Sequence, residues 1–145
     1  MTLQERASRN RLVCLDRQFL LFLLEKELSR AERYNHFASF LLFKIEGLPK
    51  KEQASALGRL AKALANEVRN SDYVGTTDKE TLGVIVPYAS VESTPIVLKR
   101  LRSESLLCLS QIHRKLGLKT SFVSYPVEAD SLDTLVDLAL KRLRR

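Results

Sequence analysis

The stretch VRNSDYVGTTDKETLGVIVP, residues 68–87, is the part of this chain that says most about its fold. It contains two short runs rich in Val, Ile, Thr and Tyr, at 73–77 and 81–86, which is the composition typical of β-strands. A charged bend at 78–80 separates these two runs. The stretch therefore predicts a β-hairpin near the middle of the chain.

The segments around this hairpin carry the periodicities of helices and of buried strands. Apolar residues recur at helical spacing in the segments 16–34, 52–69, 94–117 and 131–143. Aromatic and aliphatic runs predict two further strands at 37–45 and 119–125. The third helix is expected to continue through Val97, Leu101, Cys108 and Ile112.

After the first helix, the order of elements is strand, helix, strand, strand, helix, strand. This is the ferredoxin-like split pattern, which predicts an α+β fold with helices packed against one sheet. The sequence contains no internal repeat and no linker. We expect one domain over residues 16–145, with residues 1–15 as an N-terminal extension or the start of the first helix.

Composition limits the classes of protein to which the chain can belong. With 145 residues and 45% apolar residues, it is long enough for one domain with a hydrophobic core. No apolar run reaches the roughly 18 residues of a membrane span, and no signal segment follows the start. We therefore expect a soluble, cytoplasmic protein that does not enter a membrane.

The net charge of +7 favours an anionic partner. Aromatic residues do not alternate with the basic ones as they do in single-strand binders, so a nucleic acid is not the expected partner. Cys14 and Cys108 have no second Cys or His at metal-ligand spacing. The sequence thus predicts neither a disulfide framework nor a metal site.

Three segments, in this order and at this spacing, resemble one known family. They are DRQFLLFLLEKELSRAERY (16–34), FASFLLFKIEGL (37–48) and the hairpin from Asp72 to Pro87. Together they resemble the opening helix, the first strand and the signature hairpin of the GGDEF family of diguanylate cyclases, over about residues 16–140. The resemblance implies a nucleotidyl cyclase-like fold, with a mostly antiparallel central sheet flanked by helices, and a role in bacterial signalling.

Where the resemblance places the family's reaction centre, this chain departs from the family pattern. The signature Gly-Gly-Asp/Glu-Glu-Phe falls on 78–82, where Asp78 and Lys79 replace glycines that let backbone approach a phosphate. Glu80 keeps one acidic position, but Lys44 stands at that of a Mg²⁺-binding aspartate, where its charge repels the ion. The resemblance thus predicts a degenerate domain that is not an enzyme, with no catalytic residue, metal ligand or cofactor.

Arg69 and Asp72 match a second element of the family pattern, which this chain retains. In the family an Arg-x-x-Asp product-inhibition site ends six residues before the signature, as Asp72 does before Asp78. The resemblance adds Arg100 from the following helix, with Lys99 and Arg102 as further positive charges. An arginine can bridge phosphates or stack on guanine, and a carboxylate can accept hydrogen bonds from the guanine edge. The resemblance therefore implies that Arg69, Asp72 and Arg100 bind cyclic di-GMP.

Several interpretations of the chain stay open at this point. In the first, it is a regulatory domain that senses cyclic di-GMP and acts through a homodimer or a partner signalling protein. In the second, Arg69 and Asp72 are a structural pair, since an arginine suits a helix C-terminus and an aspartate caps a turn, and the chain is a nucleotide-free scaffold for dimerisation or protein interaction. A third interpretation is an active nucleotide cyclase with unusual metal ligands.

Overall fold

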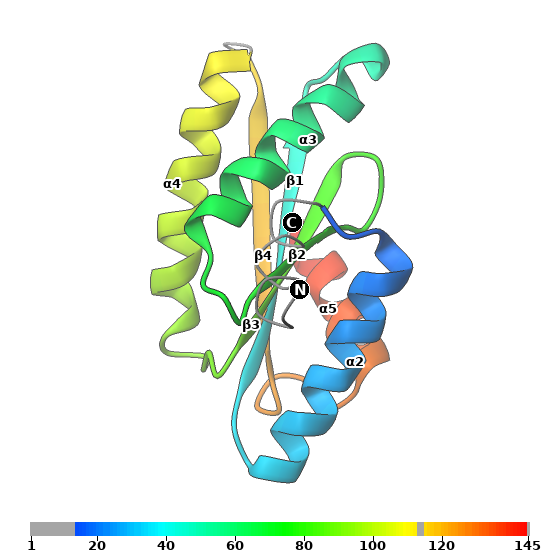
Figure 1. Cartoon of the computed structure of the whole chain (residues 1–145), viewed down its shortest axis with the longest axis vertical. Coiled ribbons are helices and arrows are strands. Elements are labelled where there is room, and N and C mark those ends of the chain that lie inside the picture. The colour runs from blue at the N-terminus through cyan, green and yellow to red at the C-terminus, as the bar shows by residue number, and fades with distance from the viewer. Residues whose placement is uncertain (1–13, 113–114, 145) are drawn as a thin grey trace, which may run out of the picture.

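The computed structural model describes residues 14–112 and 115–144, which form a four-stranded sheet with helices on both faces (Figure 1). The expected extension at residues 1–15 lies outside this range except for its last two residues. The elements in chain order are α2 (Arg17–Tyr34), β1 (Ala38–Glu46), α3 (Lys50–Glu67), β2 (Tyr73–Thr76), β3 (Thr81–Pro87), α4 (Thr94–Ile112), β4 (Gly117–Tyr125) and α5 (Leu132–Leu143).

The sheet has the strand order β2-β3-β1-β4, and all neighbouring strands are antiparallel. This arrangement confirms the α+β fold with the split pattern and the central hairpin of β2 and β3. The two central strands are almost entirely buried, because helices cover both faces of the sheet. Their continuous apolar runs, rather than alternating ones, follow from this double burial.

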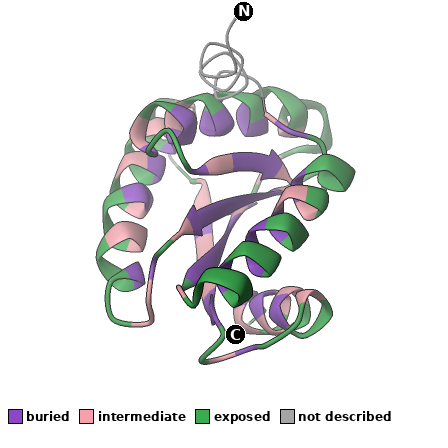
Figure 2. Cartoon of the chain, turned by 60° about the horizontal axis from the view of Figure 1, so that its bottom comes forward, coloured by how far each residue is buried: buried purple, intermediate pink, exposed green. Residues whose placement is uncertain are grey.

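The helices divide into two pairs, one on each face of the sheet. In Figure 1, α4 lies on the left, α3 crosses the view from the upper right toward α4, and α2 and α5 lie on the right. Figure 2 shows that each helix turns its buried side toward the sheet and its exposed side outward. In α2 the apolar residues that recur at helical spacing, Leu20, Leu24, Leu28 and Ala31, are buried.

Helix α4 runs through the apolar residues predicted for it, but not all of them are buried. Leu101 is buried, but Cys108 and Ile112 are only half-buried. The buried residues of this helix are Thr94, Leu101, Ser105 and Leu109. The hydroxyl of Ser105 donates to the carbonyl of Leu101 over 2.7 Å, so a serine can be buried here with its polar group satisfied. A search for apolar residues alone passes over such a position.

Several element boundaries also differ from the prediction; α4, for example, ends at Ile112 and not near Gly117. The second helix begins at Lys50, and the last strand begins at Gly117, each two residues earlier than expected. The strand is longer because β4 pairs with the whole of β1, as far as the register Glu46↔Gly117. Within residues 14–112 and 115–144, no helix is long and apolar enough to cross a membrane.

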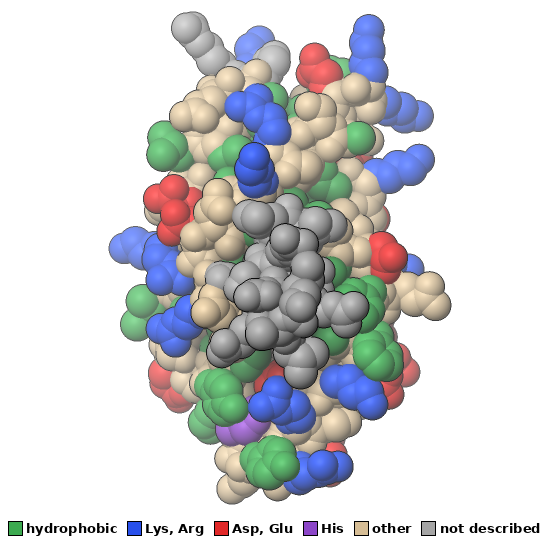
Figure 3. Space-filling model, viewed as in Figure 1, with side chains coloured by type: hydrophobic (Ala, Val, Ile, Leu, Met, Phe, Trp, Pro, Cys, Tyr) green, Lys and Arg blue, Asp and Glu red, His purple; other side chains and the backbone are tan. Residues whose placement is uncertain are grey.

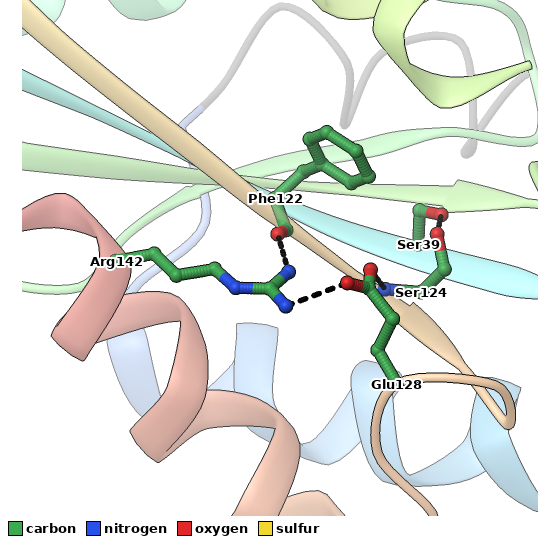
Figure 4. Close-up of polar contacts among 5 residues, drawn as sticks. All are labelled: Ser39, Phe122, Ser124, Glu128 and Arg142. Atoms are coloured by element: carbon green, nitrogen blue, oxygen red, sulfur yellow. Dashed lines mark hydrogen bonds and ion pairs between the residues drawn. The ribbon is translucent and has the colours of Figure 1, made fainter. Parts of the chain in front are cut away.

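Both edges of the sheet are covered by other parts of the chain. At the β2 edge, the N–H of Leu15 donates to Val74 O and its carbonyl accepts from the N–H of Thr76. At the β4 edge, Arg142 of α5 donates to Phe122 O over 2.9 Å, and Glu128 accepts from the N–H of Ser124 over 3.1 Å (Figure 4). These two side chains supply the partners that a fifth strand would otherwise provide.

Candidate ligand-binding site

The turn after α3 brings Arg69 and Asp72 together through the main chain. The N–H of Arg69 donates to Oδ2 of Asp72 over 2.9 Å, and the N–H of Asp72 donates to the carbonyl of Arg69 over 3.0 Å. The aspartate side chain thus closes the turn, as Asp often does. The guanidinium of Arg69 takes no part in these bonds, and the residue is exposed.

Asp72 is a buried carboxyl group with one unused oxygen. Its residue is only 2% exposed, and its Oδ1 has no hydrogen-bond partner among the described residues. Burial raises the pKa of Asp72 above its ordinary value, while the N–H of Arg69, the charges of Arg69 and Arg100 and the side chain of Ser71 act in the opposite direction. A buried acceptor without a partner is costly, so this oxygen marks a place where a donor would be favoured.

The sequence-predicted residues Arg69, Asp72 and Arg100 meet at one small hollow. Its volume is about 110 Å³, and its lining comes from the turn after α3, the end of β3 and the first turns of α4. The lining residues are Arg69, Asp72, Val86, Pro87, Tyr88, Ala89, Ser93, Val97 and Arg100. The arginines are exposed and the aspartate is buried between them, so the hollow combines a positive rim with an acidic floor.

The two additional basic residues of the prediction do not line this hollow. Arg102 turns instead toward β4, where its Nη1 donates to the carbonyl of Leu118 over 3.3 Å. Lys99 is exposed on α4. Tyr88, by contrast, lines the hollow but was not among the predicted residues. No spacing pattern in the sequence points to it.

A buried cluster of hydroxyl groups holds the start of α4, and with it one wall of the hollow. The Oγ of Ser39 on β1 lies 2.6 Å from Ser124 Oγ, 2.7 Å from Thr94 Oγ1 and 3.0 Å from the carbonyl of Ala89. Figure 4 shows Ser39 and Ser124 side by side on neighbouring strands. Because Thr94 begins α4 and Ala89 lines the hollow, these bonds fix the position of that wall relative to the sheet.

The bend between β2 and β3 forms a second concave region. The Oδ1 of Asp78 accepts from the N–H of Glu80 over 2.8 Å, so the bend is closed by a side chain and needs no glycine. Gln53 of α3 donates to Glu80 over 3.1 Å. A hollow of about 490 Å³ lies beside this bend. Its charged lining residues are Arg17, Lys50, Lys79 and Asp78.

Lys44, which the resemblance aligned with a metal-binding aspartate, lies near the end of β1. It faces another hollow of about 280 Å³, together with Asp78, Lys119 and Arg144. Basic groups outnumber acidic ones at both hollows near the bend, a balance suited to an anion. Figure 3 likewise shows many Lys and Arg side chains spread over one face of the molecule.

Comparisons with known proteins show what this architecture resembles. No family model and no curated protein matches the sequence. Among solved structures, a DGC protein from Thermotoga maritima matches with a TM-score of 0.76 and 21% identity, over 92% of this chain and 98% of the other. The diguanylate cyclase SiaD of Pseudomonas aeruginosa, solved with its activator SiaC, matches with a TM-score of 0.75 and 16% identity, over 92% of this chain and 55% of the other.

A third match is the GGDEF domain of DgcB from Caulobacter crescentus, solved in complex with cyclic di-GMP. It has a TM-score of 0.73 and 11% identity, over 92% of this chain and 83% of the other. These matches confirm the resemblance and the nucleotidyl cyclase-like fold. The chain therefore has the fold of GGDEF domains.

The same comparisons contradict one prediction from the sequence. The chain was expected not to be an enzyme, on the grounds of Lys44 and of the bend without glycines. The structures that share its fold include diguanylate cyclases, which are enzymes, so that expectation was wrong. The replacement of residues within a family motif does not by itself establish that the activity is lost.

Proposed function

We propose that this GGDEF-like domain is a regulatory module that binds cyclic di-GMP through Arg69, Asp72 and Arg100. The observation that carries the proposal is the buried carboxyl of Asp72, whose Oδ1 lacks a partner and which lines a hollow together with two exposed arginines. The complex of the Caulobacter DgcB domain supports it, because that domain has this fold and binds this ligand.

The chemistry of each residue suits one part of a cyclic dinucleotide. The edge of a guanine carries N–H donors, and a carboxylate oxygen without a partner accepts them in a strong, charge-assisted bond. The guanidinium groups of Arg69 and Arg100 present planar sets of donors that match phosphate oxygens or stack on a base. Both arginines are exposed, so they reach a ligand without first breaking an ion pair that the structure contains.

In this proposal the domain acts in the cytoplasm, and ligand binding is coupled to a homodimer or to a partner signalling protein. The hollow has a volume of only about 110 Å³, so one domain contacts only part of a cyclic dinucleotide. A second protein surface over the remaining part would bind more tightly to the liganded domain than to the free one. By linkage, that surface would strengthen ligand binding by the same factor.

Calorimetric titration of the purified chain with cyclic di-GMP tests the proposal. We expect heat of binding for the natural chain, and at least about tenfold weaker binding for Arg69→Ala, since a charge-assisted contact is worth roughly 1.5–3 kcal/mol. Arg59→Ala is the matched control, because Arg59 is an exposed arginine of α3 that does not line the hollow.

Two outcomes would contradict the proposal. One is equal affinity of the natural chain and Arg69→Ala. The other is the absence of binding up to about 100 μM ligand, where even a weak specific complex is measurable. Absence of binding would favour the second interpretation, a nucleotide-free scaffold for dimerisation or protein interaction.

A further inference from the structure

Tyr88 has a backbone conformation that its residue type does not favour. It follows β3 directly and has φ of 67°, in the left-handed region that bulky residues seldom adopt. Its N–H donates to the carbonyl of Phe37 over 2.7 Å, which holds it in this conformation. Strain of this kind persists where the surrounding structure imposes it, and it gathers at functional sites.

Burial of the Tyr88 ring does not account for this strained conformation. The residue is 60% exposed and does not belong to either hydrophobic core. An asparagine or a glycine would adopt the same backbone more readily. The fold therefore carries an exposed aromatic side chain at a position where a smaller residue would fit better.

One neighbour fixes the orientation of the Tyr88 ring. The ring of His36 lies 4.3 Å from it, centroid to centroid, at an interplanar angle of 39°. Nδ1 of His36 lies 3.0 Å from the carbonyl of Phe37. Because a carbonyl only accepts, this bond places the hydrogen on Nδ1 and fixes the imidazole ring in turn. The tyrosine ring is thus packed on one side and open to solvent elsewhere.

Tyr88 borders the hollow of the candidate site. Tyr88 lines that hollow together with Arg69, Asp72 and Arg100. At about 110 Å³ the hollow is smaller than the 300–1,000 Å³ of most ligand pockets, so a nucleotide seated in it must extend over its rim. An oriented aromatic ring at such a rim is suited to stacking against a base.

We propose that Tyr88 is the stacking platform for a guanine base of the ligand that Arg69 and Asp72 bind. This inference rests on the proposed function and adds a residue to it. Tyr88 contributes stacking area, while the arginines hold phosphate and Asp72 accepts from a base edge. His36 is the positioning residue that holds the ring from its other side.

The chain contains no tryptophan, and this makes the test direct. A Tyr88→Trp variant carries a single indole at the proposed platform, and stacking of guanine on indole quenches its fluorescence. We expect cyclic di-GMP to quench this emission in a saturable way, with a midpoint close to that of the calorimetric titration. The midpoint should move to higher concentration when Arg69→Ala is added to the same variant.

Calorimetry with leucine variants gives an independent measurement. Tyr88→Leu should bind cyclic di-GMP at least about fivefold more weakly, the lower end of what base–aromatic stacking contributes. Tyr34→Leu is the matched control, because Tyr34 is 65% exposed and does not line the hollow. Tyr88→Phe, which keeps the ring, should bind as the natural chain does.

A stability measurement separates a ligand role from a structural one. Tyr88→Asn removes the ring and leaves a residue that accepts the left-handed backbone, so its thermal midpoint should equal or exceed that of the natural chain while its affinity falls. A lower midpoint together with unchanged affinity would show that the ring serves the fold, and would overturn the inference.

The results also separate this inference from the proposed function. If the natural chain binds cyclic di-GMP, but Tyr88→Leu binds equally well and Tyr88→Trp is not quenched, the inference is wrong and the proposed function stands. If the natural chain shows no binding, both are wrong. A drop in affinity for Tyr34→Leu equal to that for Tyr88→Leu would likewise contradict the inference.

Discussion

The N–H of Arg69 donates to Oδ2 of Asp72 over 2.9 Å, so the two residues are joined through the main chain of one and the side chain of the other. The guanidinium of Arg69 is not needed for this bond. Asp72 therefore serves both the turn and the hollow, whereas the side chain of Arg69 is available to a ligand. This difference makes the two residues separable by mutation.

Substitution of Asp72 should affect stability, whereas substitution of Arg69 should not. Asp72→Ala leaves the N–H of Arg69 without its buried acceptor, and we expect a loss of about 1–3 kcal/mol in the free energy of unfolding. Arg69→Ala keeps the backbone donor and removes only an exposed side chain, so its change should stay within about 0.5 kcal/mol. Urea unfolding of the two variants checks this, and equal losses would contradict the division of roles.

Because burial raises the pKa of Asp72, the contribution of this residue to the free energy of unfolding should decrease as pH rises. Burial makes the folded state bind this proton more tightly than the unfolded state does. As pH rises from below 3.8, the unfolded state loses its proton first, so the contribution of Asp72 to the unfolding free energy falls until pH passes the folded pKa. The difference in stability between Asp72→Asn and the natural chain should therefore shift in favour of the variant as pH rises through this window.

The contribution of Glu128 to the free energy of unfolding should change with pH in the opposite direction, because its pKa is lowered. Burial acts to raise its pKa, but the hydrogen bond from Arg142, the N–H of Ser124 and the charge of Arg142 together hold it below 4.5. A lowered folded pKa stabilises the fold above pH 4.5, and the stabilisation disappears as pH falls through the folded pKa.

The test of this ion pair is the Glu128→Gln variant. The Nη2 of Arg142 lies 2.6 Å from Oε2 of Glu128, and both side chains are largely shielded, with 33% and 20% exposed. We expect the variant to lose about 1.5–3 kcal/mol at pH 7 and to approach the natural chain at low pH, as followed by urea unfolding at several pH values. A loss that is the same at every pH would contradict the assignment.

Two glycines should respond to alanine in opposite directions. A Cβ at Gly83 would lie 2.9 Å from the ring of Phe40 and 3.0 Å from Leu20, inside a packed core. We expect Gly83→Ala to destabilise the fold by about 1–3 kcal/mol. At Gly58, in the interior of α3, a Cβ meets nothing within 4 Å, so Gly58→Ala should stabilise by about 0.5–1 kcal/mol. Thermal unfolding of both variants checks the pair.

Cyclic di-GMP should promote self-association if the proposed coupling is correct. Sedimentation velocity of the natural chain with and without the ligand should show a larger species only in its presence. Arg100→Ala should suppress this species, because Arg100 lines the hollow from α4. A ligand-bound chain that sediments as the free chain does would contradict coupling to a homodimer while leaving binding itself intact.

Most of the fold could be predicted because its elements carry strong local signals. The apolar runs of the central strands and the stripes of α2 and α3 appear directly in the sequence, and the structure confirms them. The burial of Ser105 in α4, with its hydroxyl bonded to the carbonyl of Leu101, was not predicted. Hydrophobicity alone does not identify a buried polar residue whose hydroxyl group is hydrogen-bonded within its own helix.

The candidate site also contains residues that local sequence patterns predict and residues whose position depends on packing. Arg69 and Asp72 could be found by spacing, because one short turn carries both. Arg100 came from the resemblance, and its place beside them depends on the packing of α4 against α3. The prediction that the chain is not an enzyme was wrong, because the structures sharing its fold include diguanylate cyclases.

By itself, the sequence determined the order of helices and strands and the pair at the end of α3, because periodicity, caps and turn residues act over a few neighbouring positions. Only the tertiary structure decided that Asp72 is buried with one oxygen unpaired and that Tyr88 stands at the rim of the same hollow. Burial and strain depend on which distant segments pack together, here β1, β3 and α4. No local pattern of residues specifies that packing.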